Sequence, residues 1–406
     1  MRKEAITALV LGLCTAAAQA QAQDTRGVSV SDRPRPDYQA AGIRAGSFLV
    51  LPTLTLTGRY DDNIFAQDTD KQDDFVSVIL PNLVATSTWS RHRLVLRGGA
   101  EIGIFRDIDS EDYEDYVVGT DLRLDATQGD FITGTAEYRR EHEERGTAND
   151  IGGSEPTEFD IIAARLGYER TGRRITLRVT GTLDEYDYDS TLGFGSVILN
   201  QDFRDRTEYT IGSRVGYEFQ PGVSAFVQGT LNWRDYAIGI RNSDGYEVDV
   251  GLSFDLDGVT TGEVFAGYRA QTYDNALFQD SDGLTFGGTV LWLPTALTSV
   301  RLRLINEVNE AILPNASGFV STGGSVQIDH ELRPNILIGG LLGYTENDFE
   351  GVDRLEKLWN AEATVEYLID RNFRAGAAYR LRDRDVNIFG TDYTRNQVML
   401  TVRGAL

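Results

Sequence analysis

The sequence predicts an all-β protein, an 18-stranded antiparallel up-and-down transmembrane β-barrel. Three observations predict it: short polar turns recur along the chain, apolar and polar residues alternate between them, and no apolar run is long enough for a membrane-spanning helix. Because a strand, a longer loop and a second strand fit between consecutive turns, the chain indicates a series of hairpins. The turns lie 36 to 49 residues apart, at Arg91, Gln128, Gly172, Pro221, Asp257, Thr295, Arg333 and Asp370.

Two segments precede the predicted barrel. Basic residues, a short apolar run and a series of small residues open the chain, a pattern typical of a secretory signal peptide, which we assign to residues 1–22. Cys14, the only cysteine, lies within it, so we expect a mature protein without a disulfide, a thiol nucleophile or a lipid anchor. Residues 23–47, which include Arg33-Pro34-Arg35-Pro36, are predicted to form a periplasmic N-terminal segment, and residues 48–406 the outer-membrane barrel.

The strands are predicted on both sides of each turn, joined by 8 short periplasmic turns and 9 longer outer loops. In the seventeenth strand Phe373 and Tyr379 share one face, while Arg374 and Arg380 share the other. Charged groups at every second position do not suit the core of a soluble sandwich, but an aqueous lumen solvates them. The predicted strands are 48–60, 74–89, 92–106, 114–126, 130–142, 158–170, 174–187, 205–219, 222–236, 245–256, 260–273, 283–293, 298–309, 318–330, 335–347, 355–369, 371–384 and 394–406.

The net charge limits the partners. The chain carries a formal charge of −23, which argues against nucleic acid and against docking on an anionic membrane surface. Only three lysines occur, so nearly all positive charge is arginine, whose forked guanidinium pairs well with carboxylates in a polar interior. An even number of strands with short turns on one side is typical of a bacterial outer-membrane barrel, so outer-membrane lipid and lipopolysaccharide are the expected surroundings, reached through a Gram-negative export signal.

Chain ends and aromatic residues agree with this location. Trp89, Trp233, Trp292 and Trp359 lie near predicted strand ends, where aromatic girdles meet the headgroups of a bilayer. The apolar face of the last strand resembles the terminal signal that barrel-assembly machinery reads, although the chain ends in Leu406 rather than an aromatic residue.

Arginines predicted to face the lumen are the candidate pore-lining residues. Two roles are possible for these arginines. They form a salt-bridge lattice that holds the wall rigid, or they contact a hydroxylated or anionic polymer in transit. The candidates are Arg374, Arg380, Arg382, Arg384, Arg403, Arg301 and Arg303.

Two outer loops carry further candidates. Loop 188–204 contains Phe194, Val197, Ile198 and Leu199, and is expected either to fold inward as a constriction or to pack on the rim. The spaced carboxylates Asp107, Asp109 and Glu111 are weak calcium candidates, since the glycine of a dedicated calcium loop is missing. A solvated acidic surface is the main interpretation, and divalent ions that bridge the loops to lipopolysaccharide are the second.

The sequence does not favour an enzyme. A barrel hydrolase needs a histidine beside a serine, and none of His92, His142 and His330 has a serine in a recognisable arrangement. No metal-ligand cluster or phosphate-binding loop is evident either, so no cofactor is expected.

A stretch of about 40 residues at the start of the mature chain resembles a known family. Residues 28–38, then 42–48, then Tyr60-Asp61-Asp62-Asn63-Ile64-Phe65 resemble the outer-membrane β-barrel porin family often linked to exopolysaccharide loci. This resemblance implies secretion of an exopolysaccharide or capsular polysaccharide through an outer-membrane pore, together with periplasmic export components. The Arg-Pro-Arg-Pro segment resembles the family's pre-barrel segment, whose position suits docking to a periplasmic partner.

Eighteen strands leave an interior wide enough for an aqueous path, which favours transport. The function predicted at this point is secretion of a polysaccharide. One alternative is a general diffusion porin for small solutes. The second alternative is a closed structural or adhesion barrel at the cell surface.

Overall fold

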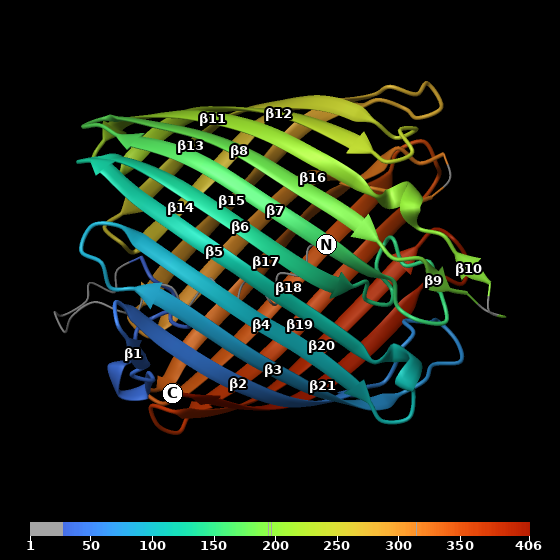
Figure 1. The fold of residues 1–406 in the computed structure, drawn as a ribbon, viewed down its shortest axis with the longest axis horizontal. Coiled ribbons are helices and arrows are strands. Elements are labelled where there is room, and N and C mark those ends of the chain that lie inside the picture. The colour runs from blue at the N-terminus through green and yellow to red at the C-terminus, as the bar shows by residue number, and fades with distance from the viewer. Residues whose placement is uncertain (1–26, 194, 196, 314) are drawn as a thin grey trace.

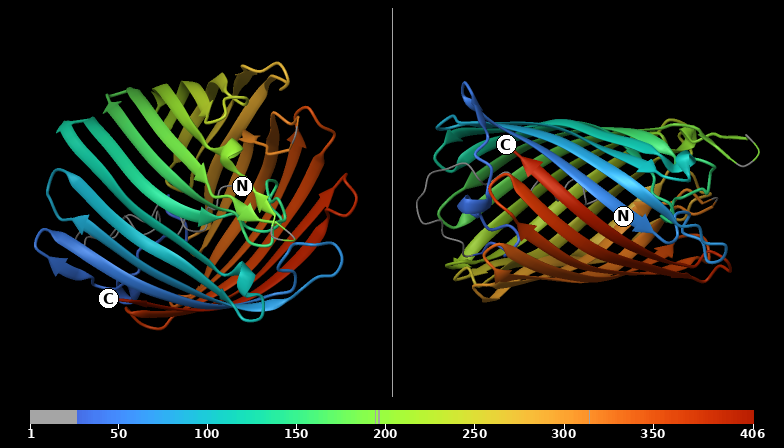
Figure 2. Two further views of the ribbon diagram at one scale, coloured as in Figure 1. Left: turned by 45° about the vertical axis from the view of Figure 1, so that its right-hand side comes forward. Right: turned by 90° about the horizontal axis from the view of Figure 1, so that it is seen from below.

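The computed structural model describes residues 27–406 except 194, 196 and 314, and it forms a closed antiparallel β-barrel (Figures 1 and 2). The predicted fold is confirmed: the 19-stranded sheet consists of the short β1 and 18 barrel strands. The barrel strands are β2 (Phe48–Asp61), β3 (Asp74–Ser87), β4 (Arg93–Phe105), β5 (Tyr113–Thr127), β6 (Asp130–His142), β7 (Glu158–Thr171), β8 (Ile175–Tyr188), β11 (Arg206–Gln220), β12 (Val223–Tyr236), β13 (Ser243–Leu256), β14 (Thr260–Tyr273), β15 (Ser281–Thr295), β16 (Thr298–Glu310), β17 (Gly318–Arg333), β18 (Ile336–Phe349), β19 (Leu355–Leu368), β20 (Phe373–Val386) and β21 (Tyr393–Ala405).

Short secondary-structure elements lie at the two ends of the barrel. They are β1 (Ile43–Ala45), the β9 (Thr191–Leu192) and β10 (Ile198–Leu199) hairpin, and the 3₁₀ helices η1 (Pro36–Tyr38), η2 (Asp109–Glu111) and η3 (Asp202–Arg204). None of the described helices is long and apolar enough to cross a membrane. The predicted signal peptide, residues 1–22, lies outside the described residues.

The barrel closes between its first and last long strands. β21 pairs with β2 from Thr53 opposite Ala405 to Asp61 opposite Gln397, so neither strand has a free edge. Each other neighbouring pair is consecutive along the chain, as an up-and-down barrel requires.

The predicted turns join the strands at one end of the barrel. Gly129 and Gly222 have φ of +91° and +75°, and a Cβ on either would lie within about 2.5 Å of a backbone oxygen of the adjacent hairpin. Only glycine fits such a turn without strain. Strand bounds differ from prediction by a few residues: β13 and β15 begin two residues early, at Ser243 and Ser281, where pairing continues past the last clear alternation.

The outer face is apolar and the inner face is polar. On β13, Val248 and Val250 are 48% and 58% exposed, whereas Asp249 between them is 2% exposed and faces inward. A continuous exposed apolar surface of this kind suits lipid. The four tryptophans are exposed on this surface, Trp89 and Trp292 near the short-turn end and Trp233 and Trp359 near the long-loop end.

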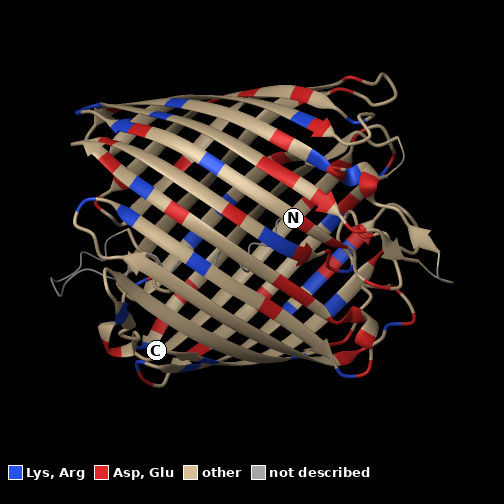
Figure 3. Cartoon of the chain, viewed as in Figure 1, with Lys and Arg blue, Asp and Glu red and all other residues tan. Residues whose placement is uncertain are grey.

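The two ends differ in charge and covering. Acidic residues gather at the long-loop end, the right-hand side of Figure 3. At the short-turn end the N-terminal segment leads into β1, which pairs with β2 through Ile43–Val50 to Ala45–Phe48 (Figure 2, right). Both ends of the lumen are therefore approached by chain segments outside the strands.

Candidate functional site in the lumen

The loop between β6 and β7, residues 143–157, crosses the lumen; we call it the lumen loop. Glu144 pairs with Arg382 of β20 at 2.8 Å, and the amide nitrogen of Asn149 donates to the carbonyl of Glu310 on β16 at 3.0 Å. Five strands separate β6 from β20 around the wall, and six separate β7 from β16. A loop that bonds to both of these distant walls spans the lumen at the long-loop end of the barrel.

Buried ion pairs fix the start of the lumen loop. Arg145 forms a two-bonded pair with Glu111 of η2, at 2.9 Å from Nε and 2.6 Å from Nη2, and both side chains are at most 6% exposed. Burial by itself lowers the pKa of the Arg145 guanidinium, but the hydrogen bonds and charge of Glu111 outweigh this and raise that pKa above its ordinary value. The loop is held by an arginine that stays charged at physiological pH.

A second pair joins the lumen loop to the next loop along the chain. Arg204 of η3 donates to both carboxylate oxygens of Glu143, at 2.9 and 3.1 Å. Burial lowers the pKa of Arg204, and the charge of Glu143 raises it by more, so that the pKa is above its ordinary value. Loop 188–204 therefore supports the lumen loop from the side through its last turn.

The far end of the lumen loop packs on the loop between β16 and β17. Ala148 contacts a buried apolar cluster made by Ala311, Ala316, Phe319 and Phe349. Arg241, in the loop between β12 and β13, donates to the carbonyls of Ala311, Leu313 and Ala316, at 2.6 to 3.0 Å. Three loops thus meet within the long-loop end of the lumen.

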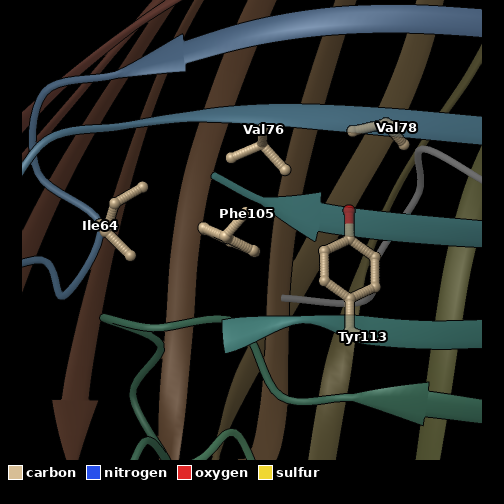
Figure 4. Packing of buried hydrophobic residues seen from close by; sticks show 5 residues of the cluster. All are labelled: Ile64, Val76, Val78, Phe105 and Tyr113. Atoms are coloured by element: carbon tan, nitrogen blue, oxygen red, sulfur yellow. The ribbon is translucent and has the colours of Figure 1, made fainter. Parts of the chain in front are cut away.

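A second apolar cluster lies on the wall at the base of the lumen loop (Figure 4). Ile64, from the loop between β2 and β3, packs with Val76, Val78, Phe105 and Tyr113. Val76 and Val78 occupy lumen-facing positions of β3, where charged residues stand on other strands. The lumen wall is therefore apolar at this place.

A small cavity of about 40 Å³ lies between this cluster and the lumen loop. Charged side chains from β2, β20, β21 and the lumen loop surround it. Its lining residues are Arg59, Ile64, Phe105, Glu111, Tyr113, His142, Glu143, Glu144, Arg145, Pro156, Arg380, Arg382, Arg395 and Gln397.

The N-terminal segment binds at the short-turn end of the lumen. The backbone N–H of Val30, fully buried, donates to Oγ of Ser299 on β16 at 3.0 Å. Arg35 pairs with Glu331 of β17, and Asp32 with Arg301 of β16, each at 3.0 Å. The Arg-Pro-Arg-Pro stretch thus binds the barrel's own wall.

The predicted pore-lining arginines lie on the inner face, and most have partners. Arg380 pairs with Glu362 at 2.8 Å, and Arg374 lies 3.5 Å from Glu366. Arg384 donates to the carbonyl of Gly146 in the lumen loop at 2.9 Å, and lies 3.8 Å from Glu356. The acidic partners of the β20 arginines come from β19 and from the lumen loop.

The remaining arginine candidates lie nearer the short-turn end. Arg301 pairs with Asp32 of the N-terminal segment. Arg303 has an interaction partner of its own. Arg403 lies near the end of β21, opposite Arg374 across the β20–β21 pair.

The predicted constriction residues lie elsewhere than the lumen loop. Val197 and Ile198 are 58% and 69% exposed, Leu199 is half-buried, and the β9–β10 hairpin that holds them projects past the barrel end (Figure 1). Phe194 lies outside the described residues. The lumen loop makes the contacts across the lumen instead. In the sequence, the charged run Glu143-Glu144-Arg145 was the pattern that could have indicated these contacts.

The weak calcium candidates do not gather. Within the described part of the chain no three histidine, cysteine or acidic side chains lie together as a metal site. Glu111 is committed to Arg145, and Asp109 begins η2.

A closed 18-stranded barrel with an apolar outer face, a charged lumen and an inserted loop defines the porin class of outer-membrane channel. The chain belongs to the family described as "Putative beta-barrel porin 2", whose model matches residues 35–406. No curated protein sequence matches significantly.

Among solved structures, the fold is similar to several porins of Pseudomonas. The chain is 14% identical to Pseudomonas aeruginosa OpdO, with a TM-score of 0.47 over 89% of this chain and 98% of that one. It is 13% identical to a BenF-like porin from Pseudomonas fluorescens Pf-5, with a TM-score of 0.48 over 88% and 99%.

Proposed function

We propose that this protein is a diffusion porin that passes small polar solutes across the outer membrane. The observation that carries the proposal is the lumen loop, which is anchored to two distant walls by Arg382 and by the carbonyl of Glu310. A porin loop in this position narrows the path while leaving its wall charged and wet. Small solutes fit such a path, whereas a polymer chain needs a continuous wide one.

The N-terminal segment supports the same conclusion. Its contacts with Ser299, Glu331 and Asp329 indicate that it covers part of the lumen at the short-turn end. Polysaccharide secretion, the function implied by the resemblance, gains no support from the family match or from the lumen. Small-solute diffusion is therefore preferred.

The test is the conductance of the purified protein in planar bilayers, together with swelling of proteoliposomes in sugars of increasing size. We expect single-channel steps, and swelling rates that fall steeply between a monosaccharide and a trisaccharide. A variant with residues 147–154 replaced by a short glycine-serine linker should show larger steps and admit larger sugars, since this part of the loop contributes Ala148 and Asn149.

A matched control replaces the exposed side chains of Val197 and Ile198 with serine. This change keeps the hydrogen bonds of Thr191 and Leu192 to the lumen loop and should leave both measurements unchanged. Absence of conductance in the wild type and in the linker variant would contradict the proposal and favour a closed surface barrel. Loss of extracellular polysaccharide from a deletion strain, with normal uptake of small solutes, would favour secretion instead.

A further inference from the structure

Four threonines lie together in the middle of the lumen wall, on β8, β11 and β12. Thr182 is directly opposite Thr210 across the β8–β11 pair. One row nearer the short-turn end, Thr180 and Thr230 lie on either side of Gly212. We call these four residues the threonine patch: Thr180, Thr182, Thr210 and Thr230.

The threonine patch faces the lumen. Val179, Ile211 and Leu231, which adjoin patch residues along the strands, are 39% to 52% exposed on the apolar outer face. Because side chains alternate between the two faces of a strand, the half-buried threonines lie on the inner face. The nearest atom to a Cβ placed on Gly212 is Oγ1 of Thr230, at 3.9 Å, so the wall between the hydroxyls is open.

The hydroxyls of the patch are available to a solute. Among the residues that the structure describes, no protein group bonds to these four hydroxyls, and none of them is sealed from the lumen. Two lumen threonines of the closing seam, Thr57 and Thr401, instead bond to each other at 2.9 Å. A charged neighbour of the patch is also committed elsewhere, since Arg214 donates twice to Glu263, at 2.9 and 2.5 Å.

The N-terminal segment lies on the other side of the short-turn end. The backbone N–H of Gly27 donates to the carbonyl of Gly258 in the turn between β13 and β14. Further along, the segment reaches Glu331 of β17, and Arg374 of β20 donates to the carbonyl of Tyr38. β8, β11 and β12 lie outside this arc of the wall, so the side that carries the patch is left to a passing solute.

A surface of free hydroxyls suits a solute that is itself rich in hydroxyl groups. Each hydroxyl donates one hydrogen bond and accepts others, so two such surfaces replace their bonds to water with bonds to each other. Neighbouring strands lie about 4.8 Å apart, an interval that lets one small solute reach several patch hydroxyls together. Arg165 of β7, opposite Thr182, adds guanidinium donors at the edge of the patch.

We propose that the threonine patch binds small polyhydroxylated solutes, such as polyols and monosaccharides, through its four hydroxyls. The proposal rests on the proposed function, which it deepens by naming the class of solute. Donors and acceptors that line a pore decide which solutes enter it, and weak contacts at several places favour entry without preventing release.

The test uses mannitol as the probe, with triethylene glycol as a linear counterpart that has fewer hydroxyl groups. Binding to the detergent-solubilised full-length protein is measured by saturation-transfer NMR, and permeation by swelling of proteoliposomes. Thr182→Val with Thr210→Val removes two hydroxyls and keeps the β-branched shape of both side chains, which suits a strand. We expect this double variant to weaken mannitol binding about tenfold, the effect of losing two neutral hydrogen bonds, and to slow swelling in mannitol relative to triethylene glycol.

Thr57→Val with Thr401→Val is the matched control. These residues are also directly opposite each other on the lumen face, but five strands separate β2 from β8. The control should leave mannitol binding and swelling unchanged. Equal weakening by the two double variants, or equal binding of the two probes, would overturn the proposal. Thr230→Val replaces the patch variant if that variant does not fold, and should weaken mannitol about threefold.

The NMR measurement separates this proposal from the proposed function. A protein that binds mannitol through the patch but never conducts would contradict the porin function and support the site. A conducting protein whose mannitol binding and permeation are unaffected by the patch variants would contradict the site and leave the porin function standing.

Discussion

Glu144, two residues beyond the end of β6, forms an ion pair with Arg382 of β20, with 2.8 Å between Oε2 and Nη1. The residues are 238 positions apart in the chain and belong to walls separated by five strands. This pair fixes the lumen loop across the barrel, and it shows how the arginines of β20 act on the pore: they position the loop and also line the path beside it.

Replacing Arg380 and Arg382 with alanine should shift the ion selectivity of the channel toward cations. The change removes two positive charges from the lumen face, namely the arginines that pair with Glu362 and Glu144. Reversal potentials in asymmetric salt measure the shift. The Glu144→Gln variant is the control that removes one anchor of the loop while making the lumen less negative, so it should increase current noise and move selectivity the other way. Unchanged selectivity in the double variant would mean that these arginines serve the wall alone.

Asp61→Ala should destabilise the barrel at its closing seam. Asp61 is fully buried and accepts three hydrogen bonds from Arg395 and one from Gln397, so its loss leaves a buried guanidinium without a partner. An uncompensated buried charge of this kind costs about 3 to 5 kcal/mol. Denaturant unfolding in detergent, followed by heat-dependent mobility on gels, measures the cost. Asp68→Asn, an exposed change in the adjoining loop, should have no effect, and an equal loss in both variants would argue against the seam.

Glu350→Gln should raise stability at neutral pH and not at acidic pH. Burial, followed by the charge of Asp348, raises the pKa of the Glu350 carboxyl in the loop between β18 and β19. A carboxyl with a raised pKa in the folded state contributes stability below its unfolded pKa, and this is lost as pH rises through the folded pKa. The variant should therefore match the wild type below about pH 4, the range of unperturbed carboxyls, and exceed it at pH 7. Thermal unfolding across this range checks the sign; a variant less stable at pH 7 contradicts it.

Glu331→Lys, which reverses the charge of this side chain, should release the N-terminal segment from the short-turn end of the lumen. Glu331 pairs with Arg35 at 3.0 Å, and the segment buries Val30 against Ser299. A cysteine placed at Val30 reports the release, because the only natural cysteine is Cys14 in the predicted signal peptide. We expect a bulky maleimide to label V30C slowly in the wild-type background and quickly with Glu331→Lys. The charge swap Arg35→Glu with Glu331→Lys should restore slow labelling; failure to restore it would assign the effect to something other than this pair.

Local patterns were sufficient for the strands. The alternation seen at Val248, Asp249 and Val250 depends only on which face of a strand meets lipid. It can therefore be recognised within a short stretch of sequence. Turns such as that at Gly222 likewise depend on backbone geometry within one hairpin. Local patterns did not identify which loop spans the lumen. The apolar residues Val197 and Ile198 made loop 188–204 the more conspicuous candidate, whereas the lumen loop begins with charged residues.

The sequence by itself determined that this chain is an 18-stranded barrel with an apolar outer face, an arginine-rich lumen and short turns at one end, since each of these is a periodic property of neighbouring residues. Only the tertiary structure decided which loop spans the lumen and where the N-terminal segment binds. Those features depend on contacts such as Glu144 with Arg382 and Asp61 with Arg395, which join residues hundreds of positions apart and exist only once the barrel has closed.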